Sequence, residues 1–250
     1  MNLPFTHKIV VVTGGSKGIG RATALRFASL WADVIITSSR DTSETEKTLE
    51  TLRSHGIRAE AYPCNVGDET SVKAFFELIL QSFDRIDILA HCAGISPNTP
   101  LDDQSVDEWK KVLETNLIGT FVVTKYAWLI MRRDDTPGSM VLISSSNAIN
   151  SFSPISAHYD SSKAGVVILT RDLAKELAKY NIRVNSIAPG WIDTSMNDTL
   201  PPEMRKEESK KIYLWRWGKP EEIASVCTFL ASDDASFITW STILVDGWYG

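Results

Sequence analysis

Short apolar runs rich in β-branched residues alternate along this chain with longer amphipathic stretches. The short runs are bounded by polar residues, Gly or Pro, and they predict strands at 8–13, 33–38, 58–63, 86–91, 139–144, 183–188 and 242–245. Apolar residues at helical spacing predict helices at 18–30, 43–55, 68–83, 105–131, 157–179 and 220–231, with Asp68 and Ser105 as candidate N-caps. This alternation predicts an α/β fold with a seven-stranded parallel sheet and helices on both of its faces.

The chain has no internal repeat, low-complexity tract or linker, so we expect one domain over residues 1–250. Residues 190–220 break the rhythm, because Pro201, Pro202 and a charged run (EMRKEESKK) fall there. We expect this segment to be an inserted, partly helical lid over a substrate site. The candidate apolar and aromatic residues of the lid are Met196, Met204, Tyr213, Leu214, Trp215 and Trp217.

Charge and cysteine content narrow the classes of function. The 26 basic and 31 acidic residues give a net charge of -5, which disfavours nucleic acid and anionic membranes as partners. The N-terminus lacks a signal-peptide pattern and no run of eighteen uncharged apolar residues occurs, so we expect a cytoplasmic protein. Cys64, Cys92 and Cys227 are far apart and lack partners at metal-ligand spacing, which predicts buried thiols and no metal site.

A glycine-rich run follows the first predicted strand and leads directly into a helix. Gly14, Gly18 and Gly20 would allow a tight turn and a close backbone approach, and the helix N-terminus offers unpaired N–H groups to a pyrophosphate. The spacing Gly-x-x-x-Gly-x-Gly differs from the general dinucleotide fingerprint, and a purely structural turn is the alternative. The predicted cofactor contacts of this turn are Gly14, Ser16, Lys17, Gly18, Ile19 and Gly20.

The end of the second predicted strand bears on the choice of dinucleotide. An NAD-binding protein would place an acidic residue there for the ribose hydroxyls, but this chain has Ser39 and Arg40. A hydroxyl and a guanidinium, with Lys17 nearby, would instead bind a 2′-phosphate. We therefore expect NADP(H) in preference to NAD(H). The alternative is that Arg40 and Asp41 form a solvated turn.

Candidate acid/base chemistry lies in the middle of the chain. Tyr159 and Lys163 are four residues apart on a predicted helix and so share a face. A nearby ammonium would stabilise a phenolate and lower the pKa of the tyrosine. Ser145, after the fifth predicted strand, could hold a substrate oxygen, and Asn116 could support an ordered water near the lysine. Each of these residues alone also has an ordinary surface or turn interpretation.

Taken in this order, the motifs resemble those of the short-chain dehydrogenase/reductase family over essentially the whole chain, from Thr13 to Gly247. The resemblance implies a doubly wound Rossmann-type fold and a homotetramer or homodimer. It implies that Tyr159 exchanges the substrate proton, that Lys163 lowers the pKa of Tyr159 and holds the nicotinamide ribose, that Ser145 orients the carbonyl, and that Asn116 carries a proton relay. The further cofactor contacts that it implies are Asn65, Val66, Ala93, Gly94, Pro189, Gly190, Ile192 and Thr194.

The chain departs from the family pattern at several positions. Asn65 replaces the usual Asp, and His91-Cys92 replaces the commoner Asn-Asn. The interval from Ser145 to Tyr159 is one residue longer than usual, so Ser146 is the alternative catalytic serine. The family tends to have glycine at two further positions, which are occupied here by Trp240 and Trp248.

The function expected from these features is hydride transfer between NADP(H) and a small ketone or secondary alcohol. Residues 216–224 look like those of 3-oxoacyl carrier-protein reductases as well as polyol or sugar dehydrogenases. Arg132 and Arg133 are the candidate basic residues for docking an acidic carrier protein, but Tyr180 stands where those reductases often have arginine. Two competing functions stay open, namely a carrier-protein reductase of this kind and a catalytically silent NADP-binding sensor.

Overall fold

Seven parallel strands form one sheet in the order β3-β2-β1-β4-β5-β6-β7. The computed structural model describes residues 4–39, 43–133, 137–150, 155–198 and 200–249. The strands are β1 (Ile9–Thr13), β2 (Asp33–Ser38), β3 (Ala59–Pro63), β4 (Ile88–His91), β5 (Gly138–Ile143), β6 (Ile182–Pro189) and β7 (Thr242–Val245). All seven predicted strands are confirmed. The order reverses between β1 and β4, which opens a crevice at the carboxyl ends of these two strands.

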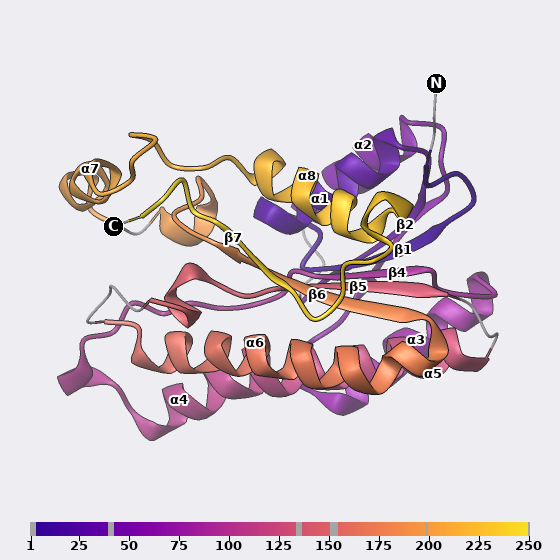
Figure 1. The fold of residues 1–250 in the computed structure, drawn as a ribbon, viewed down its shortest axis with the longest axis horizontal. Helices are drawn as coiled ribbons and strands as arrows, with labels where there is room; N and C mark the ends of the chain where they lie inside the picture. The colour runs from indigo at the N-terminus through magenta and orange to yellow at the C-terminus, as the bar shows by residue number, and fades with distance from the viewer. Residues whose placement is uncertain (1–3, 40–42, 134–136, 151–154, 199, 250) are drawn as a thin grey trace.

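Helices cover both faces of the sheet (Figure 1). One layer contains α1 (Gly18–Ser29), α2 (Ser43–Arg53) and α8 (Pro220–Ala231). The other contains α3 (Glu69–Ser82), α4 (Val106–Leu113), α5 (Gly119–Arg133) and α6 (Ala157–Leu177). The structure therefore confirms the predicted doubly wound Rossmann-type architecture.

Two apolar clusters fill the spaces between the layers. Val10 and Val12 of β1 belong to the cluster under α1 and α8, whereas Val11 belongs to the cluster shared with α3, α5 and α6. Successive residues of a strand point to opposite faces, so a sheet covered on both sides needs continuous apolar strands such as IVVVT. These buried strands form a rigid support for the loops at their carboxyl ends.

The helix ends match the predicted caps, but one long predicted helix is interrupted. The side chain of Asp68 accepts a hydrogen bond from Thr70 N at 2.9 Å, and that of Ser105 accepts one from Glu108 N at 3.1 Å. The prediction of a continuous helix over 105–131 is wrong, because the π-helical turn η2 (Glu114–Ile118) separates α4 from α5. Apolar periodicity does not reveal one extra residue in a turn, and π turns occur frequently at functional sites.

Residues 190–220 form a small insertion at the carboxyl-end side of the sheet. Ile192 pairs with Gly218 at its base, and the insertion contains the 3-10 turn η5 (Ser195–Asn197) and the helix α7 (Pro202–Lys210). Figure 1 shows α7 beside the C-terminal end of the chain.

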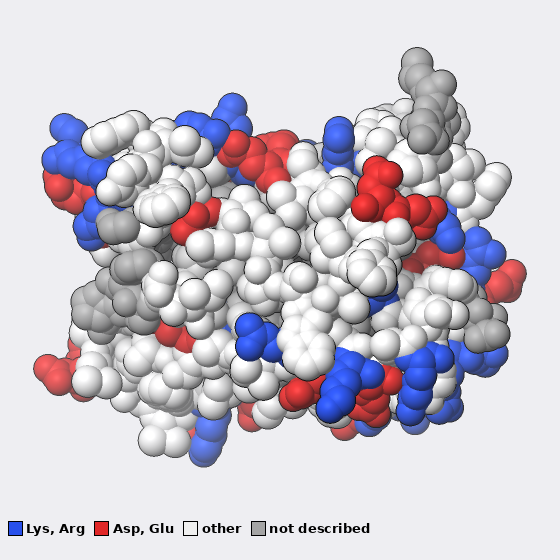
Figure 2. Space-filling view, in the orientation of Figure 1, with Lys and Arg blue, Asp and Glu red and all other residues white. Residues whose placement is uncertain are grey.

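The surface shown in Figure 2 carries blue and red side chains interspersed around its rim, with α7 contributing both signs. Within the described ranges, no helix combines the length and apolar character needed to cross a membrane. The same part of the chain holds no group of three or more His, Cys, Asp and Glu side chains arranged for a metal ion.

Candidate active site

A cavity of about 1190 Å³ opens at the carboxyl ends of the strands. This is enough space for a dinucleotide and a small substrate. The structure brings most of the predicted site residues to its wall. Those that line it are Gly14, Ser16, Lys17, Gly18, Ile19, Gly20, Ser39, Asn65, Val66, Ala93, Gly94, Ser145, Tyr159, Lys163, Pro189, Gly190, Ile192 and Thr194.

The glycine turn between β1 and α1 needs glycine for steric reasons. Gly14 has a φ of 64°, in the left-handed region that favours glycine. A Cβ at Gly20 would lie 2.2 Å from the carbonyl oxygen of Gly14. Thr194, from the insertion, lies against Gly18, where a Cβ would meet its Cγ2 at 3.4 Å. This bare backbone at the start of α1 fits the pyrophosphate of a dinucleotide.

The end of β2 has the polar character expected for a ribose phosphate. Ser39 and Lys17 are exposed and line the cavity. Arg40, the main residue of the NADP(H) prediction, lies outside the described residues, as does Asp41. Glu44, in the first turn of α2, also lines this part of the cavity, and the sequence interpretation did not include it.

His91 and Thr13 hold the ends of β4 and β1 together. Thr13 Oγ1 accepts hydrogen bonds from the backbone N–H groups of Cys92 and Ala93, at 3.1 Å and 3.2 Å, and lies 2.9 Å from His91 Nδ1. Because the hydroxyl already accepts twice, its own proton points to Nδ1. Burial, with a smaller effect of the Lys163 charge, lowers the pKa of His91 to about 3, so the ring is neutral. A neutral histidine can thus fix the turn where the family commonly has asparagine.

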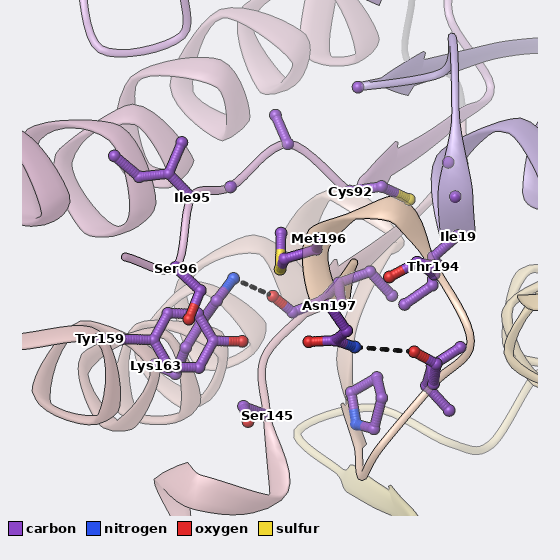
Figure 3. Close-up of a pocket in the computed structure, with 18 of the residues that line it drawn as sticks. Ile19, Cys92, Ile95, Ser96, Ser145, Tyr159, Lys163, Thr194, Met196 and Asn197 are labelled. Carbon is purple, nitrogen blue, oxygen red and sulfur yellow. Dashed lines mark hydrogen bonds between the residues drawn. The ribbon is translucent and has the colours of Figure 1, made fainter. Parts of the chain in front are cut away.

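Tyr159 stands in the first turn of α6 and its hydroxyl faces the cavity together with Ser145 (Figure 3). Burial raises the pKa of Tyr159 to about 12, and the Ser145 hydroxyl opposes this rise only in part, so the expected lowering of this pKa by Lys163 is not found. Ser145 also accepts a hydrogen bond from Asn147 N at 3.2 Å. Ser146 lines the cavity as well, but it is the Ser145 hydroxyl that opposes the rise in the pKa of Tyr159. The geometry therefore favours Ser145 over Ser146.

Lys163 lies one turn after Tyr159 on the same face of α6. Its Nζ is 5.8 Å from the centre of the Tyr159 ring and donates a hydrogen bond to Ile143 O at 2.8 Å. Burial lowers the pKa of Lys163 to about 8. A Cβ on Gly94 would approach both Lys163 Nζ and Asn116 Oδ1 at 3.3 Å, so glycine is what lets the ammonium and the amide come together.

Asn116 lies in the π turn and is fully buried. Its side chain accepts from Ile95 N at 2.9 Å and donates to Ile95 O at 2.8 Å and to Ser162 Oγ at 3.1 Å. These bonds connect the segment after β4 with α6. Asn116 thus stands behind the cavity wall and supports it rather than lining it.

A histidine next to the tyrosine, which the sequence interpretation missed, fixes the start of α6. His158 is fully buried; its Nδ1 accepts a hydrogen bond from Tyr159 N at 2.8 Å, and its Nε2 lies 2.9 Å from Glu108 Oε1. Because Nδ1 accepts, Nε2 carries the proton that is shared with the carboxylate. This pair connects α4 to the backbone of Tyr159.

Comparison with known proteins agrees with this geometry. A family model described as enoyl-(acyl carrier protein) reductase matches residues 14–249. The chain is 39% identical over 244 residues to the 3-oxoacyl-[acyl-carrier-protein] reductase of Thermotoga maritima, covering 96% of each protein. It is 35% identical over 244 residues to glucose 1-dehydrogenase 2 of Bacillus subtilis, covering 97% of this chain and 94% of the relative.

The chain belongs to the short-chain dehydrogenase/reductase family. The crystal structure of a short-chain type dehydrogenase/reductase from Mycobacterium marinum superposes with a TM-score of 0.94 at 30% identity, over 99% of this chain and 97% of that one. The protein is accordingly an oxidoreductase, and its cofactor is a nicotinamide nucleotide, as in this family.

The insertion formed by residues 190–220 differs from the aromatic lid expected. Met196 and Met204 line the cavity as predicted. Tyr213, Leu214 and Trp215 are instead 63% to 74% exposed, and Trp217 is buried against Trp191 with ring centres 5.1 Å apart. Tyr213, Leu214 and Trp215 belong to residues 211–216, the segment after α7 that we call the strap, and they do not line the cavity. The cavity side is completed by polar residues that the sequence interpretation missed, namely Glu208, Lys211 and Tyr249.

Arg132 and Arg133 do not line the cavity, so they lack the rim position expected of residues that dock a carrier protein. They end α5, which leads into the start of β5, and the Arg133 guanidinium donates to Asp84 O at 2.7 Å. The start of a strand lies at the edge of the sheet opposite its carboxyl end, where the cavity opens. Apolar periodicity shows that these residues end a helix, but it does not show at which edge of the sheet that helix end lies.

Proposed function

We propose that this short-chain dehydrogenase/reductase interconverts a small, free ketone and the corresponding secondary alcohol with NADP(H). The observation that carries the proposal is that Ser145, Tyr159 and Lys163 face one cavity together with the bare glycine turn. When bound, the nicotinamide supplies or accepts the hydride. The residues of the chain would position the carbonyl and supply the proton.

Tyr159 would act as the proton donor in the reductive direction. Its raised pKa, about 12, keeps the phenol protonated at neutral pH, and a proton is what a developing alkoxide needs. The Ser145 hydroxyl would hold the substrate oxygen beside the phenol. The Lys163 ammonium would stabilise the phenolate left behind and bind the ribose hydroxyls, while Asn116 would keep the segment after β4 in register with α6.

The preference for NADP(H) rests on Ser39, Arg40 and Lys17. No acid occupies positions 37–39, and the basic groups suit a 2′-phosphate. The test is a fluorescence titration with NADPH and NADH, repeated on Arg40→Asp. Loss of a charge-assisted hydrogen bond is expected to weaken NADPH binding ~10- to 100-fold while NADH binding is retained. Tighter binding of NADH by the unmodified protein would refute this assignment.

A carrier-protein reductase is the second candidate, because the Thermotoga maritima relative has that name. The position of Arg132 and Arg133 away from the cavity argues against carrier docking by these residues. Under the better cofactor, free ketones, secondary alcohols, sugars and acetoacetyl-carrier protein are compared by kcat/KM. Faster turnover of the carrier-bound substrate than of any free one would replace the proposed function with this candidate.

A silent NADP-binding sensor would give binding without turnover. Tyr159→Phe serves as the control for chemistry, since it removes only the phenol hydroxyl that is to exchange the proton. Turnover that is unchanged in this variant would exclude the proposed mechanism, whereas NADPH binding by the unmodified protein without turnover of any substrate would support the sensor hypothesis.

We also propose that the enzyme works as a homotetramer or homodimer. Apolar side chains on the outer surface of the π turn, α5 and α6 support this, since monomers rarely expose many of them in one region. They are Ile118, Phe121, Leu129 and Ile168, each 36% to 54% exposed. Light scattering coupled to size-exclusion chromatography gives the mass, and a 27.8 kDa species would refute the proposal.

A further inference from the structure

The wall of the cavity next to α7 is polar and is built from three separate parts of the chain. It contains Trp191 from the loop after β6, Glu208 and Lys211 from α7 and its C-cap, and Tyr249 near the C-terminus. We call these four residues the α7 wall. They line the same cavity as Ser145 and Tyr159, on the side formed by the 190–220 insertion and the C-terminal residues.

Glu208 is the centre of the α7 wall. It is 8% exposed, and its Oε2 accepts hydrogen bonds from the Tyr249 hydroxyl and from Trp191 Nε1, the latter at 3.2 Å. Its Oε1 accepts from Lys211 Nζ at 2.7 Å. A buried carboxylate with this set of donors has a fixed position.

The backbone of the C-terminal residues keeps the α7 wall in place. Tyr249 pairs with Ile212 in an antiparallel bridge, and Tyr213 N donates to Trp248 O at 3.0 Å. Leu214 N donates to Gly247 O at 3.2 Å. The strap after α7 and the C-terminus thus form a short two-stranded ribbon that positions Tyr249 against Glu208 before any substrate binds.

The chemistry of the α7 wall selects among substrates. A carboxylate offers about four acceptor positions and an ammonium three donors, so Glu208 can accept one further hydrogen bond and Lys211 can donate another. A hydroxyl group is both donor and acceptor and matches such a pair. An alkyl chain would displace water from the charged groups of Glu208 and Lys211 without offering hydrogen bonds in its place, and this loss of hydration costs free energy. A substrate carboxylate would be repelled by Glu208 and by Glu108, which also lines the cavity.

We propose that Glu208 and Lys211 are specificity-determining residues that bind a hydroxyl group of the substrate, so that the substrate class is a short, neutral, polyhydroxylated compound. This inference rests on the proposed function. It takes a substrate whose carbonyl or carbinol carbon reacts beside Tyr159, and it says which residues bind a hydroxyl elsewhere on the same molecule. The aromatic face of Trp191 suits the C–H face of such a compound.

The experiment compares matched substrates with the same carbon chain and the same reacting carbinol, for example hexitols and 2-hexanol, which keeps the C2 hydroxyl and lacks the others, under the preferred cofactor. We expect the unmodified enzyme to favour the hydroxylated member by kcat/KM. Glu208→Gln is expected to reduce that preference ~10-fold or more, mainly through KM, because a hydrogen bond to a charged group is lost. Turnover of the deoxy member should change little.

Two matched controls lie on the same helix. Glu207 and Lys210 form an exposed ion pair of 2.6 Å, with side chains 62% and 56% exposed. Glu207→Gln and Lys210→Met should therefore leave kcat/KM unchanged for both substrates. Lys211→Met is the second test variant, since its side chain is 48% exposed and tolerates replacement better than a buried carboxylate. It should also raise KM for the hydroxylated substrate alone.

Failure of the proposed function and failure of this assignment give different results. If the unmodified enzyme turns over no carbonyl or alcohol at all, the proposed function fails. If the enzyme turns over free ketones but has the higher kcat/KM for the deoxy member, only the assignment of the α7 wall is overturned. The same holds if Glu208→Gln and Lys211→Met lower kcat/KM equally for both substrates.

Discussion

Replacing Lys163 with methionine should stabilise the protein while removing its activity. The side chain is 4% exposed, and burial lowers its pKa from 10.5 to about 8. At about 1.36 kcal/mol per pKa unit, keeping the ammonium charged in the folded protein costs ~3 kcal/mol at neutral pH. Methionine removes this cost but leaves Ile143 O without its donor, a loss of about 1–2 kcal/mol. The expected net gain is about 1–2 kcal/mol at pH 7.

The pH dependence gives the sharper signature. Between pH 8 and 10.5 the unfolded chain holds its Lys163 proton more firmly than the folded one, so the stability of the unmodified protein rises with pH relative to the variant. The full penalty is present below pH 8 and it is gone above 10.5. The advantage of Lys163→Met should therefore shrink by ~3 kcal/mol across this window.

The assay is urea unfolding at pH 7, 8, 9 and 10, with Lys175→Met as the control. Lys175 is an exposed lysine on the same helix, and its replacement should give a difference that does not change with pH. If the difference between Lys163→Met and the unmodified protein is also constant with pH, the reasoning from desolvation is refuted.

Four further substitutions test the geometry. Gly20→Ala would force a Cβ to 2.2 Å from Gly14 O and should abolish detectable NADPH binding in a fluorescence titration; retained affinity would contradict the steric argument. Trp31→Gly should raise the free energy of unfolding by ~1 kcal/mol, because Trp31 has a φ of 67° and is 48% exposed; a loss in urea unfolding would mean that indole contacts outweigh the strain. Ser145→Ala should lower kcat ~100-fold or more and Ser146→Ala should have a small effect, and the reverse order would transfer the role to Ser146.

The sheet and most helices could be predicted from the sequence, because buried parallel strands need continuous apolar residues and amphipathic helices show their period. The residues of the glycine turn, with Tyr159 and Lys163, could be found for a related reason: each stands at a fixed offset from a strand or helix end. The cavity assembles them because the carboxyl ends of parallel strands meet at one edge.

What the sequence could not provide were contacts between distant segments. Glu208 and Tyr249 are 41 residues apart, and neither has a local motif that announces a bond between them. The aromatic run 213–217 attracts attention by composition, although Tyr213, Leu214 and Trp215 face outward. Trp240 and Trp248 stand where relatives tend to have glycine, and their φ angles of 71° and 60° supply the reason, since glycine adopts this conformation more easily.

The π turn at Glu114–Ile118 also limits how this region of the chain can change in length. Each residue of an α-helix advances its direction by about 100°, so deleting one residue here would restore a regular helix but rotate α5 against α4 by that amount. Val123 and Ala127, which are fully buried, would then turn out of the core. Shortening by one residue would thus displace Asn116 and unseat α5 together, whereas an exposed loop of the same protein could lose a residue at little cost.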